Sequence, residues 1–167
     1  MNRYVIADTH FNHANIIGYC NRPFTTVEEM NSKLISNWNN TVAKDDIVWF
    51  LGDFALGPKE YIITIGNSLN GRKRMVLGNH DRHNKSVFEQ AGFEFISPYP
   101  VLIDKFIILS HAPIQNPKAK SQFYNIYGHV HNDAAYLDIG ASGRCVSVER
   151  IGYRPIDLDK IIKEISK

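Results

Sequence analysis

"LGNHD", residues 77–81, places three polar side chains directly after "RKRMV", a run with the character of a strand that ends there. A plain turn needs only the glycine and the asparagine. Here Asn79 adds an amide oxygen, His80 an imidazole and Asp81 a carboxylate. From average residue usage, the letters "GNHD" arise by chance in roughly one chain of this length in a thousand. The segment therefore predicts a functional site at the end of a strand.

The same arrangement recurs along the chain, where polar side chains follow short apolar runs. Residues two apart in an extended segment point to the same side, so an Asp-x-His or His-x-His pair could reach one ion. In α/β sheets, ligands bind beyond the carboxyl ends of the strands, where loops meet. We therefore expect one convergent site. Five of the seven histidines and two aspartates take such positions: Asp8, His10, Asp53, His80, His111, His129 and His131.

Short apolar runs of the kind that form buried strands alternate at first with helical patterns. A capping box at Thr26 and Glu29 starts one helix, Pro58 suits the first turn of a second, and Asp157 caps the last. The pattern predicts one mixed α/β domain over residues 1–167, with a mixed sheet or two packed sheets and helices outside. The expected strands cover residues 4–7, 46–51, 74–77, 93–103, 105–110, 126–128 and 136–139, and a short helix covers 85–91.

The composition is that of an ordinary globular protein. Of the 167 residues, 44% are hydrophobic and 22% are charged, and the formal net charge of +2 neither favours nor excludes nucleic acid. Cys20 and Cys145 lie far apart without metal-type spacing, which indicates reduced thiols. The sequence has no signal-peptide pattern and no apolar run near the roughly 20 residues of a membrane span. We expect a cytoplasmic protein, cellular or phage-encoded.

The ordered series Asp-x-His, Gly-Asp, Gly-Asn-His-Asp, His and Gly-His-x-His over residues 8–131 resembles the calcineurin-like metallophosphoesterase superfamily. The end of the chain, "LDIGASGRCVSVERIGYRPIDLDKIIK", also looks like the closing strand and final helix of that superfamily. The resemblance implies a two-sheet β-sandwich flanked by helices in four αββα layers. It also implies a phosphoester hydrolase that depends on two metal ions.

The same resemblance assigns ligands to two divalent ions, with the carboxylate of Asp53 shared between them. Mixed nitrogen and oxygen ligands favour Mn²⁺, with Fe, Zn, Ni or Co as alternatives, over Ca²⁺ or Mg²⁺. Two carboxylates facing two dications leave positive charge to bind a phosphate group. The implied ligands are Asp8, His10 and His131 for the first ion and Asn79, His111 and His129 for the second.

In this superfamily's chemistry, a hydroxide shared by the two ions attacks phosphorus opposite the leaving oxygen. The resemblance makes His80 the general acid, which protonates that oxygen. Asp81 is expected to accept a hydrogen bond from the other ring nitrogen of His80, which would fix its tautomer. Gly78 is expected to permit the sharp turn off the strand. Three adjacent side chains thus receive three roles: ligand, acid and orienting group.

Four residues beside the motifs are candidates for substrate contact: His13, which we favour, Asn15, Arg22 and Arg82. The Ser/Thr protein phosphatases of the superfamily carry Asp-Arg-Gly after Gly-Asp, where this chain has "FALG". A monoester dianion profits from such an arginine, whereas a diester carries one negative charge that two metal ions can balance. We therefore favour a small phosphodiester, including a nucleotide-derived one, as the substrate.

Other functions remain open at this stage: a phosphomonoesterase on a small substrate, a nuclease, a non-catalytic metal-binding scaffold and a structural single-metal domain. The presence of His80 with every candidate ligand argues against the last two. The small net charge gives nucleic acid little support as a partner. The expected partners are a small phosphate ester and, for an open site, a second copy of the chain in a homodimer, without a membrane.

Overall fold

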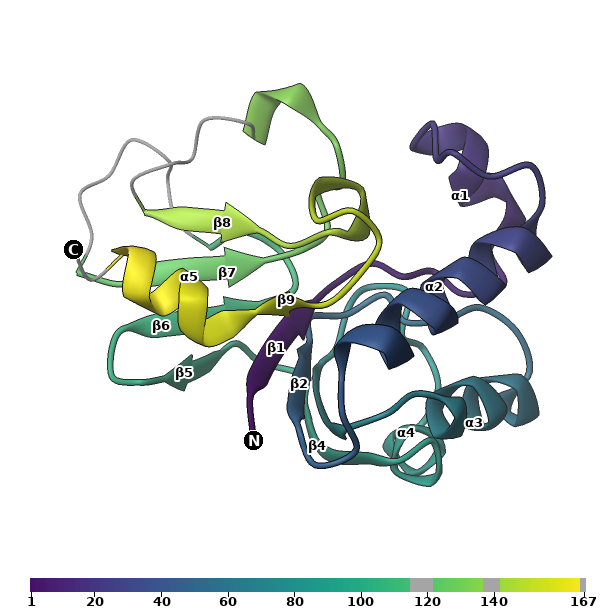
Figure 1. Ribbon diagram of the computed structural model, residues 1–167, viewed down its shortest axis with the longest axis horizontal. Coiled ribbons are helices and arrows are strands. Elements are labelled where there is room, and N and C mark those ends of the chain that lie inside the picture. The colour runs from purple at the N-terminus through teal and green to yellow at the C-terminus, as the bar shows by residue number, and fades with distance from the viewer. Residues whose placement is uncertain (115–121, 137–141, 166–167) are drawn as a thin grey trace.

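The computed structural model describes residues 1–114, 122–136 and 142–165, which form two sheets packed face to face with helices outside (Figure 1). The first sheet has the strand order β4-β3-β2-β1-β9. Its first four strands in sequence pair in parallel, and β9 is antiparallel to β1. The strands are β1 (Arg3–Ile6), β2 (Ile47–Phe50), β3 (Arg72–Val76), β4 (Phe93–Ser97) and β9 (Ile156–Asp157).

The second sheet has the order β5-β6-β7-β8, with β6, β7 and β8 parallel and β5 antiparallel to β6. An isolated parallel bridge between Ala7 and Ser147 joins the two sheets just beyond β1 and β8. The ends of strands from both sheets are therefore held next to each other. The strands are β5 (Val101–Ile103), β6 (Ile107–Ser110), β7 (Tyr124–Tyr127) and β8 (Gly143–Cys145).

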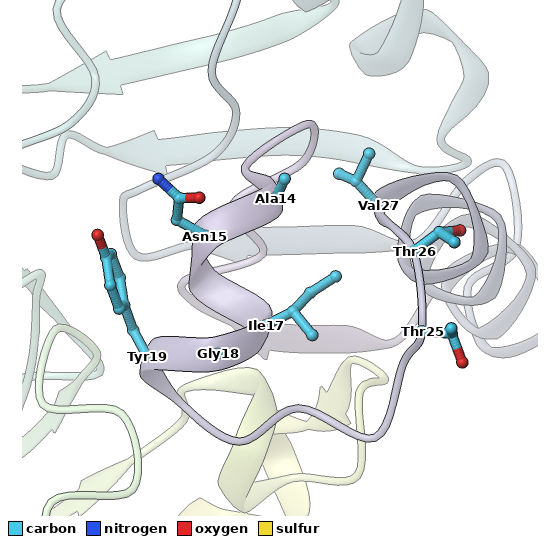
Figure 2. Close-up of a pocket in the computed structure, with 8 residues that line it drawn as sticks. All are labelled: Ala14, Asn15, Ile17, Gly18, Tyr19, Thr25, Thr26 and Val27. Carbon is cyan, nitrogen blue, oxygen red and sulfur yellow. The ribbon is translucent and has the colours of Figure 1, made fainter.

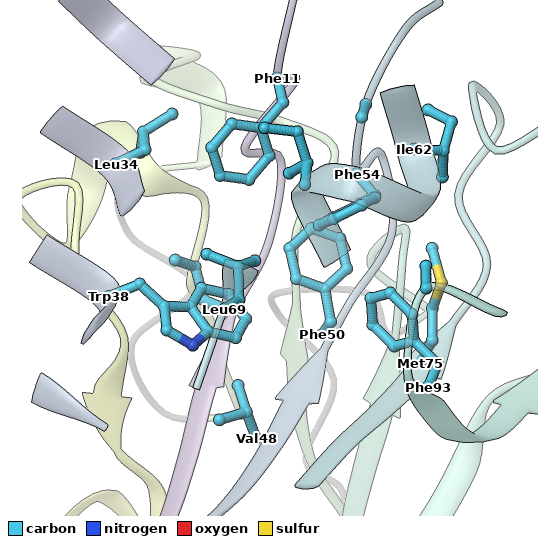
Figure 3. Close-up of a cluster of buried hydrophobic side chains, with 14 of the residues drawn as sticks. Phe11, Leu34, Trp38, Val48, Phe50, Phe54, Ile62, Leu69, Met75 and Phe93 are labelled. Atoms are coloured by element: carbon cyan, nitrogen blue, oxygen red, sulfur yellow. The ribbon is translucent and has the colours of Figure 1, made fainter. Parts of the chain in front are cut away.

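Three helices cover the outer face of the first sheet: α2 (Val27–Thr41), α3 (Lys59–Ser68) and α4 (Lys85–Gln90) (Figure 1). The helix start at Thr26 is confirmed, since Thr26 accepts a hydrogen bond from the Glu29 amide at 3.2 Å, and Oε2 of Glu29 accepts one from the amide of Thr25 at 2.7 Å. Below these helices, the rings of Phe50, Phe54 and Phe93 pack edge to face, with centroids 5.3 Å apart from Phe50 to Phe54 and from Phe54 to Phe93 (Figure 3).

The inner faces of the two sheets share a second apolar core. Val5, Trp49 and Leu51 of the first sheet and its loops meet Leu109 and Ile126 of the second. Helix α5 (Leu158–Ile165) packs on this core beside β1, and its Glu164 pairs with Arg144 of β8. The remaining helices are α1 (Ala14–Tyr19) and the short η1 (Ala134–Tyr136) and η2 (Val148–Arg150). The expected two-sheet fold flanked by helices is confirmed.

Two of the expected strands need correction or lie outside the described chain. Residues 93–103 do not form one strand, because Pro98 and Pro100 separate β4 from β5 and the two strands belong to different sheets. A proline has no amide hydrogen to donate, so it ends a ladder. In the expected strand 136–139, Tyr136 ends η1, and residues 137–139 lie outside the described residues.

No helix in the described segments is long and apolar enough to cross a membrane.

The aromatic core beneath α2 and α3 predicts a large stability difference between buried and surface rings. We expect Phe50→Ala to lower the free energy of unfolding by about 3–5 kcal/mol, because the fully buried ring leaves a cavity. Tyr99→Ala, at a ring that is 73% exposed, should change it by no more than about 0.5 kcal/mol. Urea unfolding of both variants measures the difference, and equal losses would contradict this account of the core.

Candidate metal centre

The loops that leave β1, β2, β3, β6 and β7 bring the candidate residues together at one edge of the two sheets. Each residue follows its strand by a few positions, because the parallel strands all end at the same edge. Histidine rings from different loops lie in contact there: the ring centroids of His10 are 5.2 Å from those of His80 and of His131. His111 and His129 lie 4.9 Å apart, measured in the same way.

Within this cluster, the ligand atoms form two groups that match the sets implied by the sequence. One nitrogen or oxygen from each of Asp8, His10 and His131 lies within 4.8 Å of the others. Asp53, His111 and His129 form a second group by the same measure. The amide oxygen of Asn79 is 2.9 Å from Nε2 of His111, so it belongs to the second group as well. Each group can supply mixed nitrogen and oxygen ligands to one ion.

The carboxylate of Asp53 stands between the two groups. Its Oδ2 is 3.4 Å from Nε2 of His10, in the first group, and 3.5 Å from Nε2 of His111, in the second. Its other oxygen, Oδ1, accepts a hydrogen bond from the backbone amide of His80 at 2.8 Å. One oxygen is thus held by the backbone while the other faces both groups, and a carboxylate in this position could be shared by two ions.

Several ligand atoms are oriented or left unsatisfied in a way that suits a cation. Nδ1 of His111 lies 2.8 Å from the Leu51 carbonyl oxygen, so Nδ1 carries the proton and Nε2 faces the centre. Oδ1 of Asp8 and Nε2 of His10 are buried without a hydrogen-bond partner among the described residues. Buried polar atoms are normally satisfied, so these two indicate a place for an ion. The residues present therefore fit a pair of metal ions.

The pKa values of the first group are strongly perturbed. Burial raises the pKa of the Asp8 carboxyl to about 6, against the opposing influence of His131 and His111. Burial, reinforced by His131, lowers the pKa of His10 to about 2. Burial alone would lower the pKa of His131, but hydrogen bonds to Cys20 and Glu149 and the charge of Asp8 outweigh it and raise that pKa to about 10. Perturbed pKa values gathered in one place are typical of a functional site.

The backbone of the site is strained as well, because several of its residues have a positive φ, the left-handed region that favours glycine. Left-handed conformations cost non-glycine residues on the order of 1 kcal/mol or more each, and they persist where the surrounding structure enforces them. Strain of this kind concentrates at functional sites, which agrees with the position of the metal centre. Five of the candidate ligands have a positive φ: Asp8 (59°), His10 (48°), Asp53 (59°), His129 (72°) and His131 (46°).

Glycines at two strand ends allow the loops to approach this closely. A Cβ on Gly78 would lie 2.2 Å from Oδ1 of Asp53, and one on Gly128 would lie 2.5 Å from Oδ2 of Asp8. No side chain fits at those distances without moving the carboxylates. Gly78 was expected to permit a sharp turn, but its φ is not positive, and glycine is needed there for the close approach between the β3 and β2 loops.

The role expected for Asp81 is wrong. Its Oδ2 accepts hydrogen bonds from the amides of Asp53 and Gly78, both at 2.8 Å, and its Oδ1 accepts one from the amide of Phe54 at 2.9 Å. Both oxygens are thus engaged by backbone rather than by the ring of His80. The carboxylate ties the β3 loop to the β2 loop, because three amides without a partner in the sheets converge on it. Asp81 therefore positions Asp53, not the general acid.

The four candidates for substrate contact occupy different environments. His13 lies beside the centre, with Nδ1 3.3 Å from Nδ1 of His10 and its ring centroid 6.2 Å from that of His80. Arg82 is exposed on the loop after Asp81. Asn15 lines a cavity of about 530 Å³ between α1 and the start of α2, and its side chain projects on the same side of α1 as Tyr19 (Figure 2).

Arg22 does not face the opening of the site and needs correction as a substrate residue. Its side chain is 0% exposed and forms an ion pair with Glu149, Nη2 to Oε1, at 2.7 Å. It also donates hydrogen bonds to the carbonyl oxygens of Asp8 and Thr9, both at 2.8 Å. A buried guanidinium with these partners supports the loop after β1 and has no free donor face for a phosphate group.

Two residues of the site were missed in the sequence. The hydroxyl of Ser147 donates to Oδ2 of Asp8 at 2.6 Å, and Oε1 of Glu149 lies 3.0 Å from Nδ1 of His131. Both follow β8, so the strand-end rule that found the other residues could have found them. They carry no histidine or Asp-x-His spacing to draw attention in "CVSVER".

Comparison with known proteins agrees with this geometry. The chain is 40% identical, over 98% of its length and 91% of the relative's, to an uncharacterised protein of Methanocaldococcus jannaschii. About half of it (48%) matches 40% of the gene 66 protein of Mycobacterium phage L5 at 39% identity.

Two solved structures are similar in fold. A protein of unknown function from Aquifex aeolicus superposes with a TM-score of 0.77 at 27% identity, covering 98% of this chain and 99% of that one. The nuclease MPE of Pseudomonas putida gives a TM-score of 0.50 at 17% identity, covering 77% and 61%, which supports the fold alone. The family model for calcineurin-like phosphoesterases matches residues 1–164, and the chain belongs to that family.

Proposed function

We propose that this chain hydrolyses a small phosphodiester at a dinuclear metal centre. The observation that carries the proposal is the position of Asp53, whose Oδ2 lies between Nε2 of His10 and Nε2 of His111 at 3.4 and 3.5 Å. Two ligand groups that share one carboxylate oxygen suit two ions at the roughly 3.5–4 Å separation used in two-metal hydrolysis. We propose Mn²⁺ as the ion, with Fe, Zn, Ni and Co as alternatives that suit the same ligands.

When bound, two divalent ions supply positive charge to the phosphate oxygens and a shared water of lowered pKa. The residues of the chain would preserve that charge, because Asp8 and Asp53 are the only carboxylates in the two proposed ligand sets, and the histidines and Asn79 would be neutral when they bind an ion. The nearby carboxylates of Asp81 and Glu149 are engaged by backbone amides and by Arg22. The centre therefore keeps a net attraction for an anionic ester.

His80 is the residue that we propose as general acid. Its backbone is held through the hydrogen bond from its amide to Asp53, while its ring stands edge-on to the ring of His10 and the residue is half-buried. A donor placed there can protonate the leaving oxygen as the bond to phosphorus breaks. His13, next to His80, is proposed to contact the part of the substrate that leaves.

The choice of a diester over a monoester rests on how few arginine side chains are placed to bind the phosphate group. A monoester dianion is held best by a bidentate guanidinium, and Arg22 is buried against Glu149. Of the two arginines that we considered as clamps, only Arg82 is exposed beside the site. A diester has one negative charge fewer than a monoester dianion. Its alkoxide leaving group is poor, so its departure benefits from protonation by His80.

A phosphomonoesterase and a nuclease remain the alternatives, and a non-catalytic scaffold is the least favoured. A nuclease would use the same centre, so the assays include an oligonucleotide substrate. Binding of the oligonucleotide that weakens as salt rises would favour the nuclease. We also keep the proposed homodimer, which light scattering on the purified chain tests directly.

Removal of the shared carboxylate should release both ions. We expect Asp53→Asn to lower bound Mn²⁺ from about two ions per chain to less than one, because both groups lose the same charged ligand. The control is Asp104→Asn, at an exposed carboxylate that pairs with Arg3, which should keep both ions. Elemental analysis after gel filtration gives the stoichiometry, and two retained ions in Asp53→Asn would refute the bridging role.

Loss of the proposed acid should affect rate and not metal content. We expect His80→Ala to keep both ions and to lose about 10²–10⁴-fold in kcat on an alkyl or nucleoside diester. The loss should shrink on a nitrophenyl diester, whose leaving group needs little protonation. His83→Ala is the control, since that ring lies against the Gly57 carbonyl oxygen. An equal loss on both substrates would argue against proton transfer by His80.

The diester preference is measured as kcat/KM on matched aryl monoester and diester substrates at saturating Mn²⁺. We expect the diester to be favoured, and we expect Arg82→Ala to lower kcat/KM for the monoester more than for the diester. A monoester preference of about tenfold, or roughly 1.4 kcal/mol of transition-state binding, would reverse the proposal in favour of a phosphatase.

A further inference from the structure

The loop after β8 carries a buried carboxylate that the proposed mechanism does not use. The side chain of Glu149 is 4% exposed, and its Oε1 lies 3.0 Å from Nδ1 of His131. Its Oε2 is also buried and has no hydrogen-bond partner among the described residues. Glutamate is almost never buried unless it is paired, so the position of this side chain calls for a reason.

Arg22 is the charged partner of Glu149, and it also contacts the backbone beside Asp8, a member of the first ligand group. Its Nε and Nη2 lie 2.9 and 2.7 Å from Oε1 of Glu149. Its Nη1 and Nη2 donate to the carbonyl oxygens of Thr9 and Asp8. The pair therefore touches His131 through the carboxylate and the backbone of the Asp8 loop through the guanidinium.

Stability alone does not account for such a pair. Taking two charges out of water costs about as much as their attraction returns, so apolar residues of similar size often serve a core equally well. A carboxylate on one nitrogen of an imidazole has a distinct effect: it fixes the tautomer and the ring orientation and makes the other nitrogen a better ligand. With Nδ1 of His131 donating to Glu149, Nε2 is the nitrogen left for an ion.

We propose that Glu149 and Arg22 are positioning residues for the first ion. Glu149 holds the ring of His131, and Arg22 holds both Glu149 and the strained backbone at Asp8, while the two opposite charges add no net charge to the centre. The inference rests on the dinuclear site of the proposed function. It extends that site to residues from the α1–α2 connection and from η2, which are far apart in sequence.

The test is Mn²⁺ binding by calorimetry on the full chain, without substrate, for three variants. Glu149→Gln removes the charge and keeps an acceptor for His131. The double variant Arg22→Met with Glu149→Met removes both charges and the acceptor, and it fills the space with apolar atoms beside Met30. Glu164→Gln is the matched control, because it breaks the exposed Arg144–Glu164 pair, whose atoms are 3.2 Å apart.

We expect the double variant to bind one of its two ions about 10–100-fold more weakly, the usual effect of removing an outer partner of a ligand. The other ion should be bound within about threefold of its original affinity. At two Mn²⁺ ions per chain, the electron paramagnetic resonance signal should change from that of a coupled pair in the original chain to that of a single bound ion in the double variant. Glu149→Gln should lie between the original chain and the double variant, and Glu164→Gln should match the original chain.

Thermal unfolding separates positioning from a merely structural role. Glu149→Gln leaves a buried Arg22 charge unpaired and should lower Tm. The double variant leaves the carbonyl oxygens of Asp8 and Thr9 without their donor and should lower Tm as well, but only one of its two ions should bind more weakly. The inference is overturned if the double variant binds both ions within threefold of the original chain, or if both affinities fall together in step with Tm. Failure of the original chain to bind two ions would instead refute the proposed metal centre itself.

Discussion

The structure depends on one requirement: donor atoms from two separate sheets must meet around the carboxylate of Asp53. Two dications repel each other strongly, so a site for both must place an anionic oxygen between them and surround it with ligands on each side. Asp53 follows β2 of the first sheet, and His111 follows β6 of the second. Neither sheet could supply both groups alone, because the ligands come from strand ends on both.

Several contacts between loops hold this meeting point in place. Asp81 gathers the amides of Gly78, Asp53 and Phe54, and Oδ2 of Asp8 accepts from the His129 amide and from Ser147. These hydrogen bonds join the loops after β1, β2, β3, β7 and β8. The positive φ values of the ligands are thereby enforced, because the loops have no freedom to relax. The candidate ligands are therefore held in position by hydrogen bonds within the chain.

The carboxylates of the site fall into two sets, those that face the centre and those that pair with donors of the chain. The carboxylates of Asp8 and Asp53 face the centre, where the proposed ions would be held, and the carboxylates of Asp81 and Glu149 are engaged by donors of the chain. Backbone amides bind Asp81, and a guanidinium binds Glu149. The rings of His13 and His80, both half-buried, lie next to each other beside this centre. The positive charge of the proposed ions would therefore remain available to attract an anionic ester at this edge of the two sheets.

The sequence by itself determined the ligand types, their order and their places at strand ends. Those features are local: a short apolar run followed by Asp-x-His or Gly-Asn-His-Asp indicates both the strand and the ligands at its end. The family resemblance also predicted two sheets, which the structure has, and it predicted the residues that now lie in two groups with Asp53 between them. The helix start at Thr26 could be predicted for the same reason, since cap and helix lie within four residues.

Only the tertiary structure decided how the supporting side chains act. Asp81 bonds to backbone amides and not to its neighbour His80, because residues on adjacent positions of a turn face different loops. Arg22 pairs with Glu149, a residue 127 positions away, and no local pattern records that distance. Pro98 and Pro100 separate β4 from β5, and the sheet that each strand joins is decided by partner strands elsewhere in the chain. The partners of a polar group are chosen by packing between segments distant in sequence, which a single strand-end motif does not contain.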